Sequence, residues 1–308
     1  MTAYSASDAA IEGFRISRRH PRVVLGWALF SFVASVTGAL ITLSMPKEAA
    51  AALEAIANEQ APDGGALLEM LALASPILIV GLLVQRMMDA AVYRLMLRPE
   101  DNRFGYLRLG ADELRLTALR LIYLILAVLL IALVQFAIVL LTLVVSAVGQ
   151  SAAVFVASMG ELISVVVAVV LAVRLSLASV ITFQTGRLAL FESWDATRGQ
   201  FWPLLGAYAL AFCSIVAIGL LVVVVFTLGA GVLLIATGGS MADLRSITQP
   251  KAFTFMTYLN PYVVAYTMLG CVFTAVYSAV IAAPGAYIYQ ALRQTDPADT
   301  ETTATAYP

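Results

Sequence analysis

The sequence predicts an all-α polytopic membrane protein. Of its 308 residues, 61% are hydrophobic and only 12% are charged, whereas a soluble domain is nearer half apolar and a quarter charged. The mean hydropathy of +0.93 points the same way. A helix that crosses about 30 Å of hydrocarbon needs roughly 20 apolar residues, and the chain holds six runs of this kind. This composition excludes most classes of soluble enzyme.

The six apolar runs predict six transmembrane helices arranged as three hairpins. The third and fifth runs are longer than one span requires, so we expect them to tilt or to extend beyond the membrane. A tight turn at Gly149, Gln150 and Ser151 joins the third run to the fourth. The runs cover residues 23–45, 67–84 (continuing helically to about 97), 119–148, 152–173, 204–236 and 262–283 (continuing to about 292).

The basic residues predict the orientation of these spans. Fifteen of the 18 Lys and Arg residues fall on one side of the six runs, and an excess of positive charge in short loops marks the cytoplasmic side. Both termini are then cytoplasmic. The first run is longer than the apolar region of a signal peptide, so we expect it to be retained as an anchor. The chain has no evident cysteine pair and no glycosylation sequon, which favours a bacterial inner membrane.

These features divide the chain into three predicted parts. Residues 1–22 form an N-terminal cytoplasmic amphipathic arm, and residues 23–292 form the six-helix transmembrane domain. Residues 293–308 are rich in Thr and Asp and contain few apolar side chains. A segment of that composition cannot bury enough apolar surface to fold, so we expect a disordered cytoplasmic tail.

A short amphipathic segment precedes each odd-numbered span. At an offset of 180 residues, Glu12 aligns with Glu192 and Arg18 with Arg198, while the middle segment, FGYLRLGADELRLTALRLI, has the same character without a clear register. We therefore expect three repeats, each with a cytoplasmic interfacial helix before its hairpin. An apolar stripe flanked by Arg suits the headgroup boundary. The alternative is that these segments pack on the protein's own cytoplasmic loops.

One motif carries a resemblance to a known family. The string LFESWDATRGQFWPLLGAY, which follows VRLSLAS, resembles the bacterial six-helix inner-membrane proteins grouped with the glycerophosphoryl diester phosphodiesterase membrane domain. The string YRLMLRPEDNRFGYLRLGADELRL looks like an uncharacterised proteobacterial branch of that group. The resemblance implies the six-span layout. The positions that match the group's pattern before the fifth span are Ser193, Trp194, Thr197, Arg198, Gly199, Phe201 and Trp202.

The resemblance does not imply phosphodiester hydrolysis. The soluble catalytic domain of the phosphodiesterases is absent, and their chemistry needs several acidic residues and histidines around a metal ion. This chain has one histidine, His20. We predict no catalytic residues, no metal site and no cofactor.

Glu161 is the one carboxylate that lies well inside a predicted span. It follows Ala152 by nine residues, which corresponds to a depth of roughly 13 Å. The geometry of the hairpin makes Gln135 and Thr142 its nearest polar partners. Intramembrane carboxylates are costly and often functional. The three residues are either a protonatable site for ion or proton coupling, or a structural hydrogen bond around a neutral or water-contacting Glu161.

A second set of candidates concerns the lipid headgroups. Arg174 closes the fourth span and either binds a lipid phosphate or extends its side chain to the membrane surface, as arginines at helix ends commonly do. In the sixth span, small residues recur every four positions and serve either packing within the chain or a dimer seam. The candidate interface contacts are Arg18, Arg174, Trp194, Arg198 and Trp202.

Two functions compete on this evidence. The leading hypothesis is a non-enzymatic inner-membrane protein that organises lipids or a partner protein at the cytoplasmic leaflet. The alternative is a small transporter or lipid-translocating protein that uses Glu161 in a central cavity. The expected partners are membrane lipids, an unidentified membrane or cytoplasmic protein, and a second copy of the chain. A net charge of −1 gives no basic field to attract nucleic acid.

Overall fold

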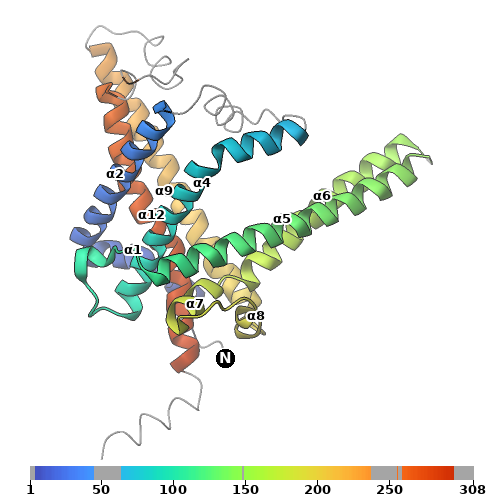
Figure 1. Cartoon of the computed structure of the whole chain (residues 1–308), viewed down its shortest axis with the longest axis horizontal. Coiled ribbons are helices and arrows are strands. Elements are labelled where there is room, and N and C mark those ends of the chain that lie inside the picture. Colours follow the sequence, from blue (N-terminus) through green and yellow to red (C-terminus); the bar gives the residue numbers. More distant parts are fainter. Residues whose placement is uncertain (1–3, 45–63, 148, 237–254, 256–258, 295–308) are drawn as a thin grey trace, which may run out of the picture. The chain divides into compact units, whose positions relative to one another are not determined.

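The computed structural model describes residues 4–44, 64–147, 149–236, 255 and 259–294. Within these ranges the chain is helical and contains no strand, as Figure 1 shows, so the all-α prediction is confirmed. The predicted disordered tail lies outside the described residues from position 295 onward. The elements are α1 (Ala6–Arg19), α2 (Pro21–Ser44), α4 (Gly64–Leu97), η1 (Arg103–Tyr106), α5 (Ala111–Ser146), α6 (Gln150–Arg174), α7 (Ala178–Thr185), α8 (Glu192–Ala196), α9 (Phe201–Ala236) and α12 (Pro261–Gln294).

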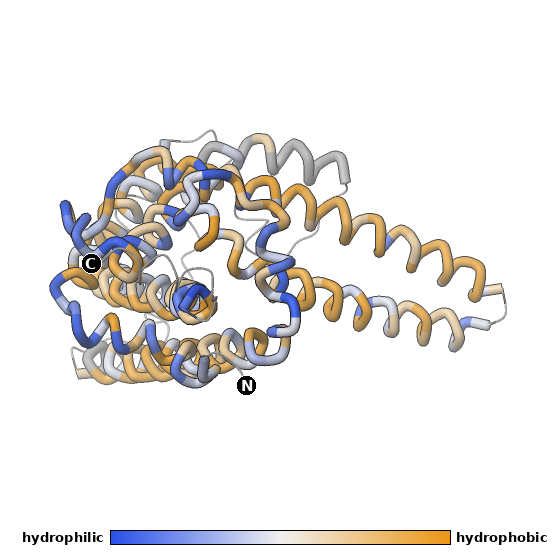
Figure 2. The backbone as a smooth tube through the Cα atoms, turned by 90° about the horizontal axis from the view of Figure 1, so that it is seen from below, coloured by the Kyte–Doolittle hydropathy of each residue, from blue (hydrophilic) through white to orange (hydrophobic). Residues whose placement is uncertain are grey.

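Five helices in the described part of the chain are long and apolar enough to cross a membrane: α2, α5, α6, α9 and α12. They correspond to five of the six predicted runs and make the chain a multi-pass membrane protein by length and hydropathy. Figure 2 shows that most turns of the α5–α6 hairpin are apolar. The remaining run, 67–84, falls within α4, several of whose side chains lie outside the described residues. The arrangement of six spans in three hairpins is not shown.

The chain divides into two compact units. The first unit comprises Met1–Ala9, Leu109–Tyr208 and Gly285–Pro308, and the second comprises Ala10–Arg108 and Ala209–Pro284. Neither unit tests the predicted division into arm, membrane domain and tail, which stays a prediction.

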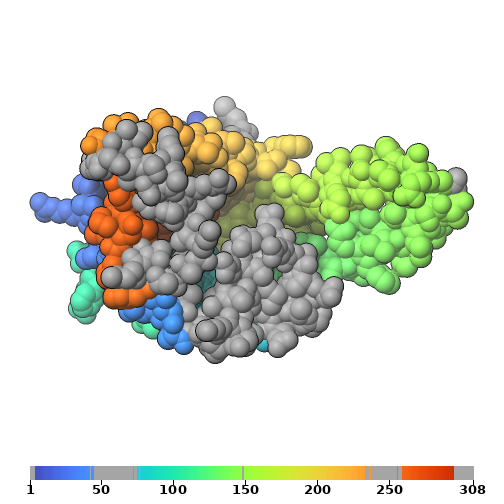
Figure 3. All heavy atoms as spheres, turned by 90° about the horizontal axis from the view of Figure 1, so that it is seen from above, coloured from blue at the N-terminus to red at the C-terminus, as the bar shows by residue number. Residues whose placement is uncertain are grey.

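The first unit contains the hairpin of α5 and α6. Gly149 stands directly before α6 and closes the predicted tight turn. Farther along, a Cβ added to Gly160 would lie 2.5 Å from the side chain of Ile138, so the absent side chain lets the two helices approach closely. Figure 3 shows the side chains of α5 and α6 meeting along the hairpin.

Near the N-terminus of the chain, Tyr4 packs into the core of the first unit. That core includes Leu177, Leu204 and Ile288, all fully buried. Burial raises the pKa of Tyr4 to about 12, because the phenolate would lose its hydration. Tyr4 is therefore a neutral, apolar anchor for the beginning of the chain.

In the second unit, α1 packs directly against the backbone of α12. Ala10 of α1 joins a buried cluster with Ile215 and Val280. A Cβ added to Gly13 would lie 2.3 Å from the Cα of Val280 and 2.6 Å from the carbonyl oxygen of Ala279. Only a glycine allows this contact, so α1 uses part of its surface to pack on the protein itself.

The loop that follows α4 folds back onto the helices of the second unit. The indole nitrogen of Trp27, on α2, donates to the carbonyl of Gly105 at 2.8 Å. The Nη1 atom of Arg94, on α4, donates to the carbonyl of Tyr106 at 2.9 Å. Both side chains are fully buried. Arg94 was counted among the cytoplasmic loop charges, and it stands instead inside the protein as a support for this loop.

Small residues of α12 pack within the second unit. Cys271, Ala275, Ala279 and Ala283, which repeat every four positions, are all buried, and so is Ser278 in the neighbouring row. This favours the intramolecular use of the small residues in the sixth span. It leaves the oligomeric state open.

The segments before the odd-numbered spans differ from one another. A separate helix, α1, precedes α2, and Pro21 begins the new helix, as its missing N–H favours. Before the third span, the backbone N–H of Gly110 donates to the carboxylate of Glu113 at 2.8 Å, and α5 then runs on without a break. This segment is therefore no separate interfacial helix.

The third segment is mostly irregular. α7 ends at Gly186, whose φ of +68° suits glycine, and α8 has only five residues. The spacing of Leu188, Phe191 and Trp194 predicts an apolar stripe on one helix, and the structure shows no such continuous helix there. All three side chains are nevertheless exposed.

We predict that Gly13→Ala lowers the stability of the protein. The added Cβ meets backbone rather than a movable side chain, and overpacking of this kind typically costs about 1–3 kcal/mol. The measurement is the thermal unfolding midpoint in detergent. Gly26→Ala is the control, because an added Cβ there meets no atom within 4 Å. Equal midpoints for the two variants would contradict the packing of α1 on α12.

Candidate functional site

The hairpin of α5 and α6 brings Gln135 and Glu161 together. The amide nitrogen of Gln135 lies 3.4 Å from each carboxylate oxygen of Glu161. Glu161 is exposed on the surface of α6. The third predicted member, Thr142, lies seven residues farther along α5, about 10 Å away along the helix axis. Its buried hydroxyl has no hydrogen-bond partner among the residues that the structure describes. The structure thus pairs two of the three residues.

Arg174, at the end of α6, is held by the segment that contains α8. Its Nη1 donates to the carbonyl of Thr197 at 3.0 Å. In return, the hydroxyl of Ser193 donates to the carbonyl of Arg174 at 2.7 Å. The carbonyls of the last helical turn have no partner within the helix, so Ser193 and Thr197, both fully buried, complete the end of α6. We call these contacts the Arg174 clamp.

Aromatic rings complete the Arg174 clamp. The guanidinium carbon lies 5.3 Å from the centre of the Trp194 ring and 5.9 Å from that of Phe201, within the range of a cation–π interaction. Four residues of the sequence motif therefore contact one arginine. Because Arg174 has protein partners, its predicted role as a lipid contact stays a prediction.

The outer surface of the same segment is apolar and aromatic. Leu188, Phe191, Trp194 and Trp202 are 42%, 68%, 43% and 77% exposed, and we call them the aromatic patch. Phe201 supports Trp202 through an edge-on ring contact at 5.4 Å. Single exposed apolar residues are ordinary, whereas several of them in one short segment favour an interaction surface.

Two arginines flank the aromatic patch. Arg187 forms an ion pair with Glu192 at 3.2 Å. Arg198 is exposed, and its side chain pairs with none of the described residues. Arg18, the other predicted interface arginine, is exposed near the end of α1 in the second unit.

A polar cluster in the second unit was not predicted. Arg86 and Asp89 of α4 form an ion pair at 2.6 Å, with side chains only 15% and 10% exposed. The amide nitrogen of Gln85 lies 3.4 Å from Asp89 and 3.3 Å from the hydroxyl of Ser278. Ser278 lies midway along α12, so these groups stand beside the middle of a spanning helix rather than at its end.

The sequence did carry a signal for this cluster. Gln85, Arg86 and Asp89 belong to the predicted helical continuation of the second run, and an ion pair at positions i and i+3 is favourable on a helix. Of the three, the prediction of orientation uses only Arg86, as one of the fifteen basic residues on the cytoplasmic side. No metal site is formed by three or more His, Cys, Asp or Glu residues in the described ranges.

Comparison with known proteins adds no family assignment. No family model, curated protein or solved structure matches this chain. The resemblance to the phosphodiesterase membrane domain therefore stays a prediction from the motif.

We predict that Ser193→Ala destabilises the protein. The substitution leaves the partly buried carbonyl of Arg174 with only the longer contact to the Thr197 hydroxyl, at 3.4 Å. The loss of one net hydrogen bond costs about 0.5–1.5 kcal/mol. Thermal unfolding of the full chain in detergent measures the loss. The matched control is Ser158→Ala, since the exposed Ser158 bonds only within its own helix. A loss no greater than that of the control would contradict the clamp.

Proposed function

We propose that this chain is a non-enzymatic integral protein of a bacterial inner membrane that organises lipids, or a protein partner, at the cytoplasmic leaflet. The observation that supports this proposal is the exposed aromatic patch. Aromatic side chains are enriched at the depth of the headgroups, and an apolar surface beside arginines suits that boundary. The Arg174 clamp holds the segment in a fixed position. The side chains of the patch therefore lose little conformational entropy when they contact lipid.

Charge supports lipid rather than a purely apolar partner. Arg198 stands beside the patch without an internal ion pair in the described residues. Anionic headgroups attract basic residues near the cytoplasmic surface. We propose that Arg198 contacts lipid phosphate while Trp194 and Trp202 lie at the hydrocarbon boundary.

We further propose that the chain shares the fold of the phosphodiesterase membrane domain group. The Arg174 clamp gives the motif residues Ser193, Trp194, Thr197 and Phe201 a structural purpose. Because these residues hold the structure together, their presence supports a shared fold with that group. It supports no hydrolytic activity.

The alternative, transport through a central cavity that contains Glu161, receives less support. Glu161 is exposed on α6, and its carboxylate accepts a hydrogen bond from the amide of Gln135. A coupling site needs a path that connects the carboxylate to both sides of the membrane. An exposed position on one hairpin does not supply that path.

The depth of Trp194 tests the proposed function. The Trp202→Phe variant fluoresces from Trp194 and from the buried Trp27 only. A second variant, with both Trp194→Phe and Trp202→Phe, gives the fluorescence of Trp27 alone, which is subtracted as background. In nanodiscs, brominated lipids should quench Trp194, and brominated phosphatidylglycerol should do so more strongly than phosphatidylcholine. One arginine near an anionic surface is worth about 1 kcal/mol, so the local preference should be about fivefold.

Two further variants show whether Arg198 is responsible. Arg198→Ala should remove the preference for phosphatidylglycerol. Arg103→Ala, an exposed arginine of the second unit, should leave it unchanged. Quenching of Trp194 by aqueous iodide alone, with no effect of brominated lipids, would refute the proposal.

The proposed topology is tested separately. We predict both termini in the cytoplasm, because 15 of the 18 basic residues fall on one side of the six predicted runs. Alkaline phosphatase fused after Pro308 should be inactive, and a green fluorescent protein at the same position should fluoresce. The opposite pair of results would place the C-terminus in the periplasm.

A further inference from the structure

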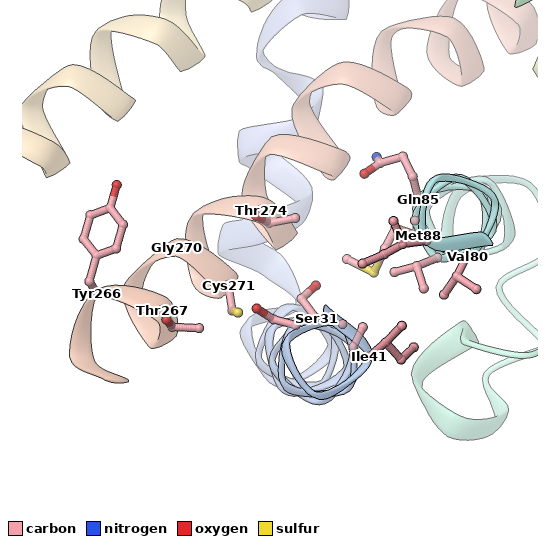
Figure 4. Close-up of a pocket in the computed structure, with 16 residues that line it drawn as sticks. Ser31, Ile41, Val80, Gln85, Met88, Tyr266, Thr267, Gly270, Cys271 and Thr274 are labelled. Carbon is pink, nitrogen blue, oxygen red and sulfur yellow. The ribbon is translucent and has the colours of Figure 1, made fainter. Parts of the chain in front are cut away.

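A cavity of about 450 Å³ lies between α2, α4 and α12 of the second unit. Figure 4 shows the three helices presenting side chains to it. Each helix contributes a glycine to its wall: Gly38, Gly81 and Gly270. An added Cβ at any of the three would meet no atom within 4 Å. The cavity therefore exists because small residues face one another where three helices meet.

The length of the cavity matches one leaflet. Its wall on α2 runs from Ser31 to Ile41, ten residues or about 15 Å, which is half of a hydrocarbon core of about 30 Å. Much of the wall is aliphatic, with Ala34, Val80 and Val84 among its members. A volume of this size suits a small ligand, and an aliphatic wall suits an acyl chain.

One end of the cavity carries unused hydrogen-bonding groups. Ser31 is 9% exposed, and its hydroxyl has no partner among the described residues. The side-chain hydroxyl of Thr274 makes no hydrogen bond to that part of the chain either. Hydroxyls elsewhere in the helices, such as that of Thr37, donate to the carbonyl one turn back, at 2.8 Å. A buried hydroxyl without a partner costs free energy, so Ser31 points to a ligand that supplies one.

Gln85 adds an acceptor to this end. Both of its hydrogen bonds, to Asp89 and Ser278, use the amide nitrogen. The carbonyl oxygen of its side chain has no partner among the described residues. Ser31, Thr274 and Gln85 come from three different helices and line the same cavity.

The charge around the cavity favours a neutral ligand. None of the described residues that line it is charged. Asp89, which accepts a hydrogen bond from Gln85 of the lining, is neutralised by Arg86 at 2.6 Å. A phosphate would bring an unpaired negative charge into this region, at a high desolvation cost. A hydroxyl headgroup brings none.

We propose that this cavity binds a neutral lipid with a hydroxyl headgroup, of which diacylglycerol is the simplest example. Its hydroxyl bonds to Ser31, Thr274 and the carbonyl oxygen of Gln85, and one acyl chain lies along the aliphatic wall. The site lies in the second unit and requires nothing of the aromatic patch, so either proposal can fail without the other.

Photocrosslinking in nanodiscs tests the site. The probes are a diacylglycerol with a diazirine in one acyl chain and the phosphatidic acid with the same chains. Diacylglycerol should label peptides of α2 and α12 that line the cavity, and phosphatidic acid should label them less. Ser31→Ala should weaken labelling by about fivefold, the loss expected for one net hydrogen bond.

Glycine variants test whether the cavity itself is needed. Gly81→Leu should abolish labelling, because its side chain fills the cavity. Gly26→Leu, on an exposed position of α2 with no atom within 4 Å of an added Cβ, should preserve it. If Gly81→Leu does not fold, Gly38→Leu fills the same space from α2 and carries the same expectation.

Three results would overturn the proposal. Equal labelling by the two probes would remove the preference for a neutral headgroup. Equal labelling of Gly81→Leu and Gly26→Leu would place the lipid elsewhere. Displacement of the probe by free glycerol would indicate a soluble polyol rather than a lipid.

Discussion

Carbonyls that are at least partly buried and lack a partner within their own helix are the constraint on which this structure depends, because neither hydrocarbon nor the protein interior supplies water in place of that partner. The carbonyl of Arg174 accepts a hydrogen bond from the hydroxyl of Ser193. The carbonyl of Gly105 accepts a hydrogen bond from Trp27, and the carbonyl of Tyr106 accepts one from Arg94. In each case a connection folds back onto a helix to form the bond. The connections are thereby fixed to the helices they join, and the exposed rings around α8 gain a rigid support.

The sequence predicted the helices well because apolar runs are a strong local signal. The helix α12, Pro261–Gln294, agrees with a run that was expected to continue to about residue 292. The proximity of Gln135 and Glu161 was also predictable, since a tight turn fixes which residues of two antiparallel helices stand level with each other. Both results follow from spacing along the chain alone.

Contacts between distant segments could not be predicted in this way. Ser193 reaches Arg174 only because the irregular segment after α7 returns to the end of α6. The second run predicts a helix that continues to about residue 97 and so includes Arg86 and Asp89, but it does not predict that their side chains are buried. Their burial depends on where α4 meets α2 and α12, which no local pattern specifies.

The length of α5 has a consequence for the bilayer that surrounds it. Its 36 residues extend about 54 Å, far more than the hydrocarbon thickness, and its partner α6 has only 25 residues. Even a tilt of about 40° leaves α5 longer than a core of about 30 Å. The first turns of α5 carry Asp112, Glu113 and Arg115 and extend beyond the hydrocarbon, and the hairpin accommodates the rest of α5 by tilting. A thicker bilayer would need less tilt, so the angle of this hairpin to the membrane would change with acyl-chain length.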